Sequence, residues 1–473
     1  MASSFRFFSL PRELRDMVYE HYFAVAGGYV CDSQSFLRGK LRSSGVFSRR
    51  IDLDLIFTCR QVAAETKGLP FRANTITFKT VTSQDLGVLA VDFDFVVQYL
   101  EQEQNSLFLC GGHYVTSEAH DELKRRYPQF APLLDRLRAD RGYFGFLPGQ
   151  YSYGEVPSVY REFCRDTLHA LSLCNPDALD ILRLAHRSAL RTLTCPVHHW
   201  VIPSQDDMDR LLSNLHETSK LTTERRLILD GIQRFSAAAV AIHFMGSLPA
   251  ASRMQLRDVV LDEDHEAVAL PECHGRGLIP FCQENPQLRI QRRLKLWQNF
   301  FPAEKTVQSP IMFMSRMTER VSRWMVEARA LPSAGMPAVS FSLLLDGSGP
   351  GSQHFSHLFQ STVQRHAAWQ LAWTASQERR DHLVLSWFDR RGREGLPMRG
   401  YYGYFYEDFP AAMRDLVKDD PRSIVRCNFD VGKPWDIGNS IPDHQAWSLS
   451  KWDAEWYRQD SQWWDVVSSF CTY

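Results

Sequence analysis

This chain lacks both the cysteine spacing of a metal-binding or disulfide-rich protein and any long apolar run. Its ten cysteines include no Cys-x-x-Cys pair, which argues against a zinc ribbon and against a disulfide framework. The best apolar stretch, residues 237–245, contains His243 and is far shorter than the ~18 residues of a membrane helix. Pro11 and Glu13 interrupt any signal segment at the N-terminus. We therefore expect a soluble intracellular protein with reduced thiols, located in the cytoplasm, the nucleus or both.

An excess of charge of either sign is also missing. Lys plus Arg number 54 and Asp plus Glu number 55, which gives a formal net charge of −1. The basic residues occur in scattered pairs, such as Arg125-Arg126, and this pattern is typical of solvated helix faces rather than of a phosphate-binding surface. The glycine-rich residues 275–277 and 347–351 match neither a phosphate loop nor a dinucleotide motif. The sequence therefore indicates no nucleic-acid partner, no membrane partner and no cofactor.

The first helix is predicted over residues 10–23, which carry one apolar stripe at helical spacing. Pro11 suits a first helical turn, where its missing N–H is not needed, and Gly27-Gly28 ends the helix. The following residues, 27–50, are rich in Ser, Gly and Arg and show no steady periodicity. We interpret them as a surface loop that could be shortened without unfolding the protein, because loop-closure entropy grows slowly with length.

A second helix is predicted over residues 53–67, where apolar side chains again fall on one face. Gly68 and Pro70 stop it. Residues 74–80 alternate and are β-branched, which indicates a short strand.

Two blocks of this N-terminal region resemble fungal F-box-like proteins. Phe8-Ser-Leu-Pro-Arg-Glu-Leu-Arg-Asp-Met-Val-Tyr19 is similar to the Leu-Pro-x-Glu-Leu-x-x-x-Ile opening of F-box motifs. Residues 53–66 and 71–78 resemble the second half, which typically reads Leu-Leu-x-Thr-Cys-Arg-Gln-Ile-x-x-Glu-Ala followed by Asn-Thr-Phe-x-Phe. The insertion at residues 27–50 is longer than an ordinary F-box tolerates, and the aromatic residue that often closes the motif has no clear counterpart.

The resemblance implies a non-catalytic substrate-recognition subunit of an SCF-type ubiquitin ligase, which binds a Skp1-like adaptor, a cullin and an unknown protein target. The alternative is an intracellular scaffold whose F-box-like helices pack internally and recruit no ligase. If the chain is a ligase subunit, Leu14 and Val18 should lie on an apolar face of the first helix that is at least partly exposed. The residues expected to bind the partner are Leu10, Pro11, Leu14, Met17, Val18, Leu55, Ile56, Cys59 and Val62.

The middle of the chain alternates between helix-like and strand-like segments. Helices are predicted over residues 92–100, 161–173 and 178–190, and a polar segment with a turn over residues 114–146. Strands over residues 226–230 and 257–262 flank a helix over residues 235–248. This is the length of a βαβ unit, which favours parallel pairing.

Residues 261–286 form the most unusual segment, because they concentrate carboxylates, histidines and cysteines after a predicted strand. Loops after strand ends often carry the site in α/β proteins. Adjacent side chains point in different directions, so Cys273 and His274 are poorly placed to form a nucleophile pair. We interpret the segment as a structured acidic loop that caps a helix beginning near Gly277, or else as a protein-binding surface. The remote alternative is an enzyme or metal protein that uses the Asp/Glu/His/Cys block at residues 262–282, with Cys273 and His274 as a nucleophile arrangement or with Asp262, Asp264, His265 and Cys273 as metal ligands.

A second group of possible metal ligands is Cys195-Pro-Val-His198-His199. Zinc needs a second pair of ligands at a compatible spacing, and no recognised pattern supplies it. We therefore expect these histidines to be ordinary packed or surface residues, and no metal to be bound.

The composition changes after Trp297, because eleven of the twelve tryptophans lie from there to the C-terminus. Residues 333–350 are expected to be a loop, and the aromatic tail, residues 435–473, places Trp452 and Trp456 one helical turn apart. The predicted fold is mixed α/β: F-box-like helices in residues 1–80, an α/β body with partly parallel strands in residues 81–300, and an aromatic-rich C-terminal region packed on it in residues 301–473.

Overall fold

The fold is known from a computed structural model, which describes residues 7–44, 51–139, 152–178, 182, 197–214, 232–300, 310–349, 352–378, 387–388, 404–433, 451 and 454–455. Helices and a largely parallel sheet make up the described residues, so the predicted mixed α/β class is confirmed. Among these residues, no helix is both long and apolar enough to cross a membrane.

A seven-stranded sheet with the order β2-β1-β3-β4-β5-β6-β7 forms the centre of the molecule. Only β2 runs antiparallel to its neighbour, and the other five pairs are parallel. The predicted strands at residues 74–80 and 257–262 are confirmed as β3 and β4, and they pair in parallel; residues 226–230 lie outside the described part. The strands are β1 Tyr29–Cys31, β2 Arg42–Ser43, β3 Ile76–Lys79, β4 Asp258–Glu263, β5 Arg289–Lys295, β6 Phe341–Asp346 and β7 Val425–Cys427.

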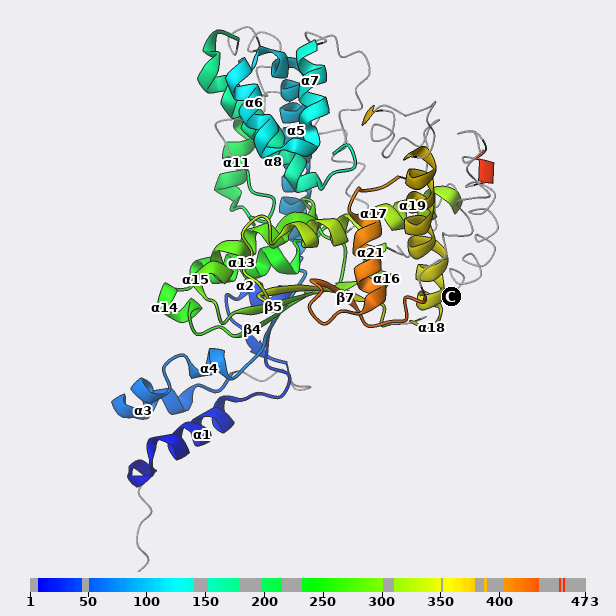
Figure 1. Cartoon of the computed structure of the whole chain (residues 1–473). Coiled ribbons are helices and arrows are strands. Elements are labelled where there is room, and N and C mark those ends of the chain that lie inside the picture. Colours follow the sequence, from blue (N-terminus) through cyan, green and yellow to red (C-terminus); the bar gives the residue numbers. More distant parts are fainter. Residues whose placement is uncertain are drawn as a thin grey trace, which may run out of the picture.

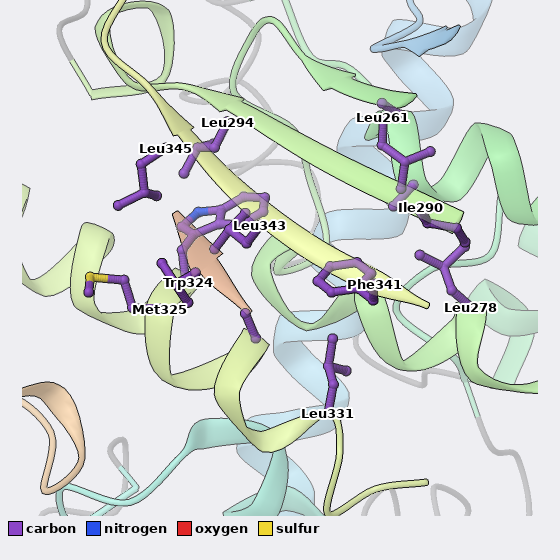
Figure 2. Close-up of a cluster of buried hydrophobic side chains, with 14 of the residues drawn as sticks. Leu261, Leu278, Ile290, Leu294, Trp324, Met325, Leu331, Phe341, Leu343 and Leu345 are labelled. Atoms are coloured by element: carbon purple, nitrogen blue, oxygen red, sulfur yellow. The ribbon is translucent and has the colours of Figure 1, made fainter. Parts of the chain in front are cut away.

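One face of this sheet is covered by α13 (Ala237–Ser247), α15 (Ile279–Glu284) and α17 (Pro310–Ala330), as Figure 1 shows. Alternate residues of the central strands β3 to β6 point into this main core, for example Leu261, Ile290 and Leu343, and Trp324 of α17 packs against them (Figure 2). The opposite face carries half-buried polar residues such as Lys79 and Arg293. The period-2 pattern of burial is the reason why these segments form strands.

A second core belongs to a helical cluster that stands beyond the covered face of the sheet (Figure 1). It is built on α5 (Gln84–Gly111), which Ser83 caps by accepting a hydrogen bond from the Leu86 amide at 3.1 Å. The predicted helices at residues 92–100 and 161–173 are confirmed within α5 and α8 (Pro157–Cys174), whereas nearly all of the helix predicted at residues 178–190 lies outside the described residues. The described part of the predicted polar segment, residues 114–139, contains two helices of the cluster, and the turn predicted at residues 142–145 lies outside the described residues. The remaining helices near this cluster are α6 Ser117–Arg126, α7 Ala131–Ala139, α8 Pro157–Cys174 and α11 Gln205–Asn214, with short turns Gly112–Tyr114 and Pro128–Phe130.

The N-terminal region extends from the other side of the sheet (Figure 1). Its first helix, α1 (Arg12–Phe23), is confirmed, but the second is broken into the 3-10 turn η2 (Asp54–Phe57) and α3 (Arg60–Glu65). A further short helix, α4 (Leu69–Arg72), follows. The Cys59 sulfur accepts a hydrogen bond from the Val62 amide, so it caps a new helix where a continuous one was predicted.

The interpretation of residues 27–50 as a surface loop is wrong for the described residues 27–44. They contain β1, β2 and the helix α2 (Ser33–Leu37), which Asp32 caps by accepting from the Ser35 amide at 3.0 Å. The ring of Phe36 lies 5.4 Å from that of His243 in α13. The segment was missed because each element is very short and its partners are distant in sequence.

The C-terminal region also joins the sheet. Residues 333–350 are not only a loop, because β6 lies within them, and β7 pairs beside it. The expected boundaries near residues 80 and 300 therefore do not divide the sheet, since all three segments contribute strands. Trp452 and Trp456 lie outside the described residues. The other helices of the body are α14 Ala250–Arg253, η5 Pro271–Leu278, α16 Leu296–Phe300, α18 Ser352–Phe359, η6 Gln360–Gln364, α19 Arg365–Glu378 and α21 Phe409–Lys418.

Candidate functional site

The N-terminal helices pack around a small core of their own. Tyr19 and Phe23 of α1 meet Val62 of α3 and Leu69 of α4, with Leu55 and Ile56 partly buried against them. Val62 was expected to bind the partner, but it is only 4% exposed and packs inside this unit. The expectation is therefore wrong for this residue. Leu55 and Ile56 present only part of their surface, because the same core holds them.

Glu65 fastens α1 to α3. The Arg15 guanidinium donates to both of its carboxylate oxygens, at 2.8 and 3.0 Å, and the Tyr19 hydroxyl donates at 2.8 Å. The hydrogen bonds from Arg15 lower the pKa of Glu65 to about 2, and burial raises the pKa of Tyr19 to about 12. The buried side of α1 is thereby fixed in rotation about the helix axis.

Asn74 holds the end of α1 against the beginning of β3. Its side-chain oxygen accepts from the Val25 amide at 2.8 Å, and its amide nitrogen donates to the carbonyls of Phe23 and Pro70 at 2.8 and 2.9 Å. One buried side chain therefore satisfies three backbone groups between the helix and the sheet.

The outward side of α1 is apolar and exposed. Leu14, Met17 and Val18 retain 46%, 65% and 47% of their accessible surface, and they lie opposite the buried Tyr19 and Phe23 on the helix. We call these three side chains the outward face of α1. Their exposure is what the sequence predicted for Leu14 and Val18. Of the other candidates, Pro11 and Cys59 are also exposed, and Leu10 is half-buried.

Further exposed apolar side chains of the N-terminal region were missed. Phe57 of η2 is 81% exposed, and Phe8 and Tyr22 are exposed as well. Phe57 directly follows Leu55-Ile56, so the apolar run was visible in the sequence. Because one continuous helix was predicted over residues 53–67, Phe57 was not recognised as an exposed apolar residue. Exposed apolar side chains that gather in one region mark an interaction surface more often than scattered ones do.

The acidic segment at residues 261–286 has a structural centre at Glu263, the last residue of β4. Its carboxylate accepts from the Ala237 and Ala238 amides at the start of α13, at 2.9 and 3.2 Å. Arg292 of β5 donates to the same carboxylate at 2.7 and 2.9 Å, and its guanidinium lies 4.3 Å from the ring of Trp324. Each side chain of this pair is only 1% exposed. A carboxylate at a helix N-terminus also complements the helix dipole.

Cys273 and His274 are both buried in η5 and do not pair with each other as a nucleophile and a base. The His274 ring nitrogens contact the Ser236 hydroxyl at 2.7 Å and the Ala269 carbonyl at 2.8 Å. Burial raises the pKa of the Cys273 thiol, which favours the unreactive form. Within the described ranges, no three His, Cys, Asp or Glu side chains are grouped as a metal site would require.

The histidines of the second candidate ligand group have other contacts. His199 lies 2.7 Å from a carboxylate oxygen of Glu101, and His198 stacks on Trp200 with ring centres 5.1 Å apart. Cys195 lies outside the described residues. These contacts are those of packed histidines.

His274 should make the stability of the protein depend on pH. Burial holds its pKa well below the ordinary 6.5, so below pH 6.5 the unfolded chain takes up a proton that the folded chain does not. We expect unfolding free energy to fall by about 1.4 kcal/mol per pH unit from this group. Urea unfolding of the wild type and of His274→Gln between pH 7.5 and 5 measures it. An identical pH dependence in both proteins would contradict the assignment.

Comparisons with protein-family models, curated proteins and solved structures found no match to this chain.

Proposed function

We propose that this protein is a non-catalytic interaction protein that recruits its partner through the outward face of α1. The observation that carries the proposal is the exposure of Leu14, Met17 and Val18 on a helix whose other side is already buried. A helix that is apolar on both sides needs a second packing partner, or else leaves apolar surface in water. The F-box-like sequence of this helix suggests that the partner is a Skp1-like adaptor bound to a cullin.

Rigid attachment of α1 supports this role. Glu65 fixes the rotation of the helix and Asn74 ties its end to the sheet, so the outward face is presented in one orientation. A pre-organised face costs less conformational entropy on binding than a mobile one. A ligase subunit of this kind would hold its target, on the body, at a defined position relative to the adaptor.

The double variant Leu14→Asp/Val18→Asp tests the proposal. Purified wild-type chain should form a complex with recombinant Skp1-like adaptor on size exclusion, and the variant should bind at least about 30-fold more weakly, since a lost apolar anchor costs about 2 kcal/mol. The matched control is Leu173→Asp, which changes an exposed apolar residue of α8. The melting temperature should be unchanged in both variants, because the replaced side chains are exposed.

Absence of a complex with the wild type, or equal binding by the double variant, would overturn the ligase proposal. Either result would favour the scaffold alternative, in which the outward face of α1 binds a different partner or no partner.

A further inference from the structure

A cavity of about 390 Å³ opens where the two hydrophobic cores meet. It lies beside the middle of α5, whose first half packs in the main core and whose last turns pack in the helical cluster. Parts of α8, η5 and α17 and the side chain of Tyr406 complete its wall. Small-molecule sites commonly have volumes of roughly 300–1,000 Å³ and favour such boundaries between packing units.

The α5 side of the cavity is lined by amide side chains. Gln98, Gln102 and Asn105 follow each other at helical spacing along one face. An amide group offers both a donor and an acceptor, so this wall suits a polar ligand rather than a hydrocarbon.

Charges of both signs meet in the same wall. Arg161 and Arg323 supply two cations, and Glu101 and Glu272 supply two carboxylates. The cavity therefore has no excess of either charge, although it is strongly polar. A ligand with a single charge would meet repulsion from one of these two pairs.

Two ion pairs in the wall of the cavity are long, although Arg323 also donates to Glu319 at 2.7 Å and to the Tyr406 hydroxyl at 3.0 Å, and Glu101 lies 2.7 Å from His199. The Arg161 Nε atom lies 3.2 Å from Glu101, and Arg323 Nη1 lies 3.4 Å from Glu272, whereas the buried pair beneath α13 closes at 2.7 Å. Charge-assisted hydrogen bonds normally measure about 2.7–2.9 Å. Arg161 Nη2, 3.7 Å from Glu327, has no hydrogen-bond acceptor in the described part of the chain. The Nη2 atom of Arg161 is therefore a buried hydrogen-bond donor without an acceptor among the described residues.

The turn before η5 supplies a second and independent observation. Ala269 and Leu270 both adopt left-handed backbone conformations, with φ of 62° and 57°, although neither is glycine. The Asp94 carboxylate accepts from the Ala269 amide at 2.7 Å and His274 contacts its carbonyl, so the turn is held in place. Leu270 lines the cavity. Strained backbone of this kind concentrates at ligand sites.

We propose that this cavity binds a small zwitterion of the amino-acid type. The carboxylate of the ligand would be bound by Arg161, and its ammonium group by Glu272. The amide side chains of α5 would bind the rest of the molecule. This site is separate from the outward face of α1, and the proposal does not depend on the proposed function.

Thermal-shift measurements on the purified full chain test the proposal, with each common free L-amino acid at millimolar concentration as the probe. At least one should raise the melting temperature, because a ligand that binds only the folded state stabilises it. The deaminated acid and the decarboxylated amine of that same amino acid should give no shift. If the deaminated acid raises the melting temperature as much as the amino acid does, the ligand is a simple anion and the zwitterion proposal is overturned. If no amino acid raises the melting temperature, the proposed site is overturned.

Two variants locate the binding. Gln102 lines the cavity and is exposed, so Gln102→Trp should obstruct the opening without disturbing a core and weaken the calorimetric affinity at least about tenfold. Arg161→Lys keeps the charge but removes the planar fork, and it should also weaken binding. The control is Val88→Trp, at an exposed position of α5 outside the cavity lining. Unchanged affinity in Gln102→Trp would contradict the proposal even if Arg161→Lys failed to fold.

Discussion

Replacement of Arg292 by Met is expected to destabilise the protein by about 3–5 kcal/mol, the range found when one partner of a buried ion pair is removed. Within the described part of the chain, the variant leaves the buried Glu263 carboxylate with only the amides at the start of α13 as partners. It also removes the hydrogen bond that Arg292 donates to the Pro271 carbonyl at 2.7 Å, which fixes the start of η5. Urea unfolding followed by circular dichroism measures the change.

Two further variants separate charge from packing. Arg289→Met changes an exposed arginine of the same strand and should cost less than about 0.5 kcal/mol. Adding Glu263→Gln to Arg292→Met removes the unpaired charge and should restore part of the loss. If Arg292→Met and Arg289→Met unfold at the same urea concentration, the buried pair does not stabilise the fold.

Deletion of residues 32–48, bridged by a short Gly-Ser linker, is expected to cost about 3 kcal/mol or more, from lost apolar burial and unmade hydrogen bonds. The deletion removes α2 and β2, so β1 keeps its pairing with β3 but becomes the edge strand of the sheet. It also removes the Ser33 hydroxyl that accepts from the Thr82 amide at 3.1 Å, and the contact of Phe36 with α13. A change below about 1 kcal/mol, as expected of an unstructured insertion, would show that the segment is dispensable.

Neighbouring single substitutions provide the matched control for the deletion. Phe36→Ala should cost about 2 kcal/mol, because the ring is partly buried against the main core. Leu37→Ala should be nearly neutral, since Leu37 is exposed. If Phe36→Ala and Leu37→Ala lower the free energy of unfolding by the same amount, the segment is held by its backbone hydrogen bonds and not by the ring of Phe36.

The sequence predicted the elements whose own side chains carry a strong periodic signal. The first helix, the helix α13 and the strands β3 and β4 were all found in this way, and so was the exposure of Leu14 and Val18. The expectation of partly parallel strands is confirmed, although the strand at residues 226–230 from which it was argued lies outside the described residues and β4 pairs with β3 and β5 instead. These features depend on local pattern, which a single sequence contains.

The elements that were missed depend on distant partners. The three residues of β1 are buried because they pair with β3, and Glu263 finds Arg292 only through the parallel register of β4 and β5. From the sequence alone, a buried carboxylate cannot be distinguished from an acidic side chain on the surface. The cavity was missed for the same reason, because its wall is assembled from α5, α8, η5 and α17, which no local pattern connects.

The order of the strands along the chain has a consequence for synthesis on the ribosome. β3 ends at Lys79, and its partner β4 begins at Asp258, about 180 residues later. At roughly 5–20 residues per second, the growing chain exposes the β3 edge for about 10–35 s before β4 emerges. Until β4 emerges, the nascent chain therefore exposes both the unpaired parallel edge of β3 and the apolar outward face of α1. A chaperone that binds at this stage would decide how much of the protein reaches the folded state.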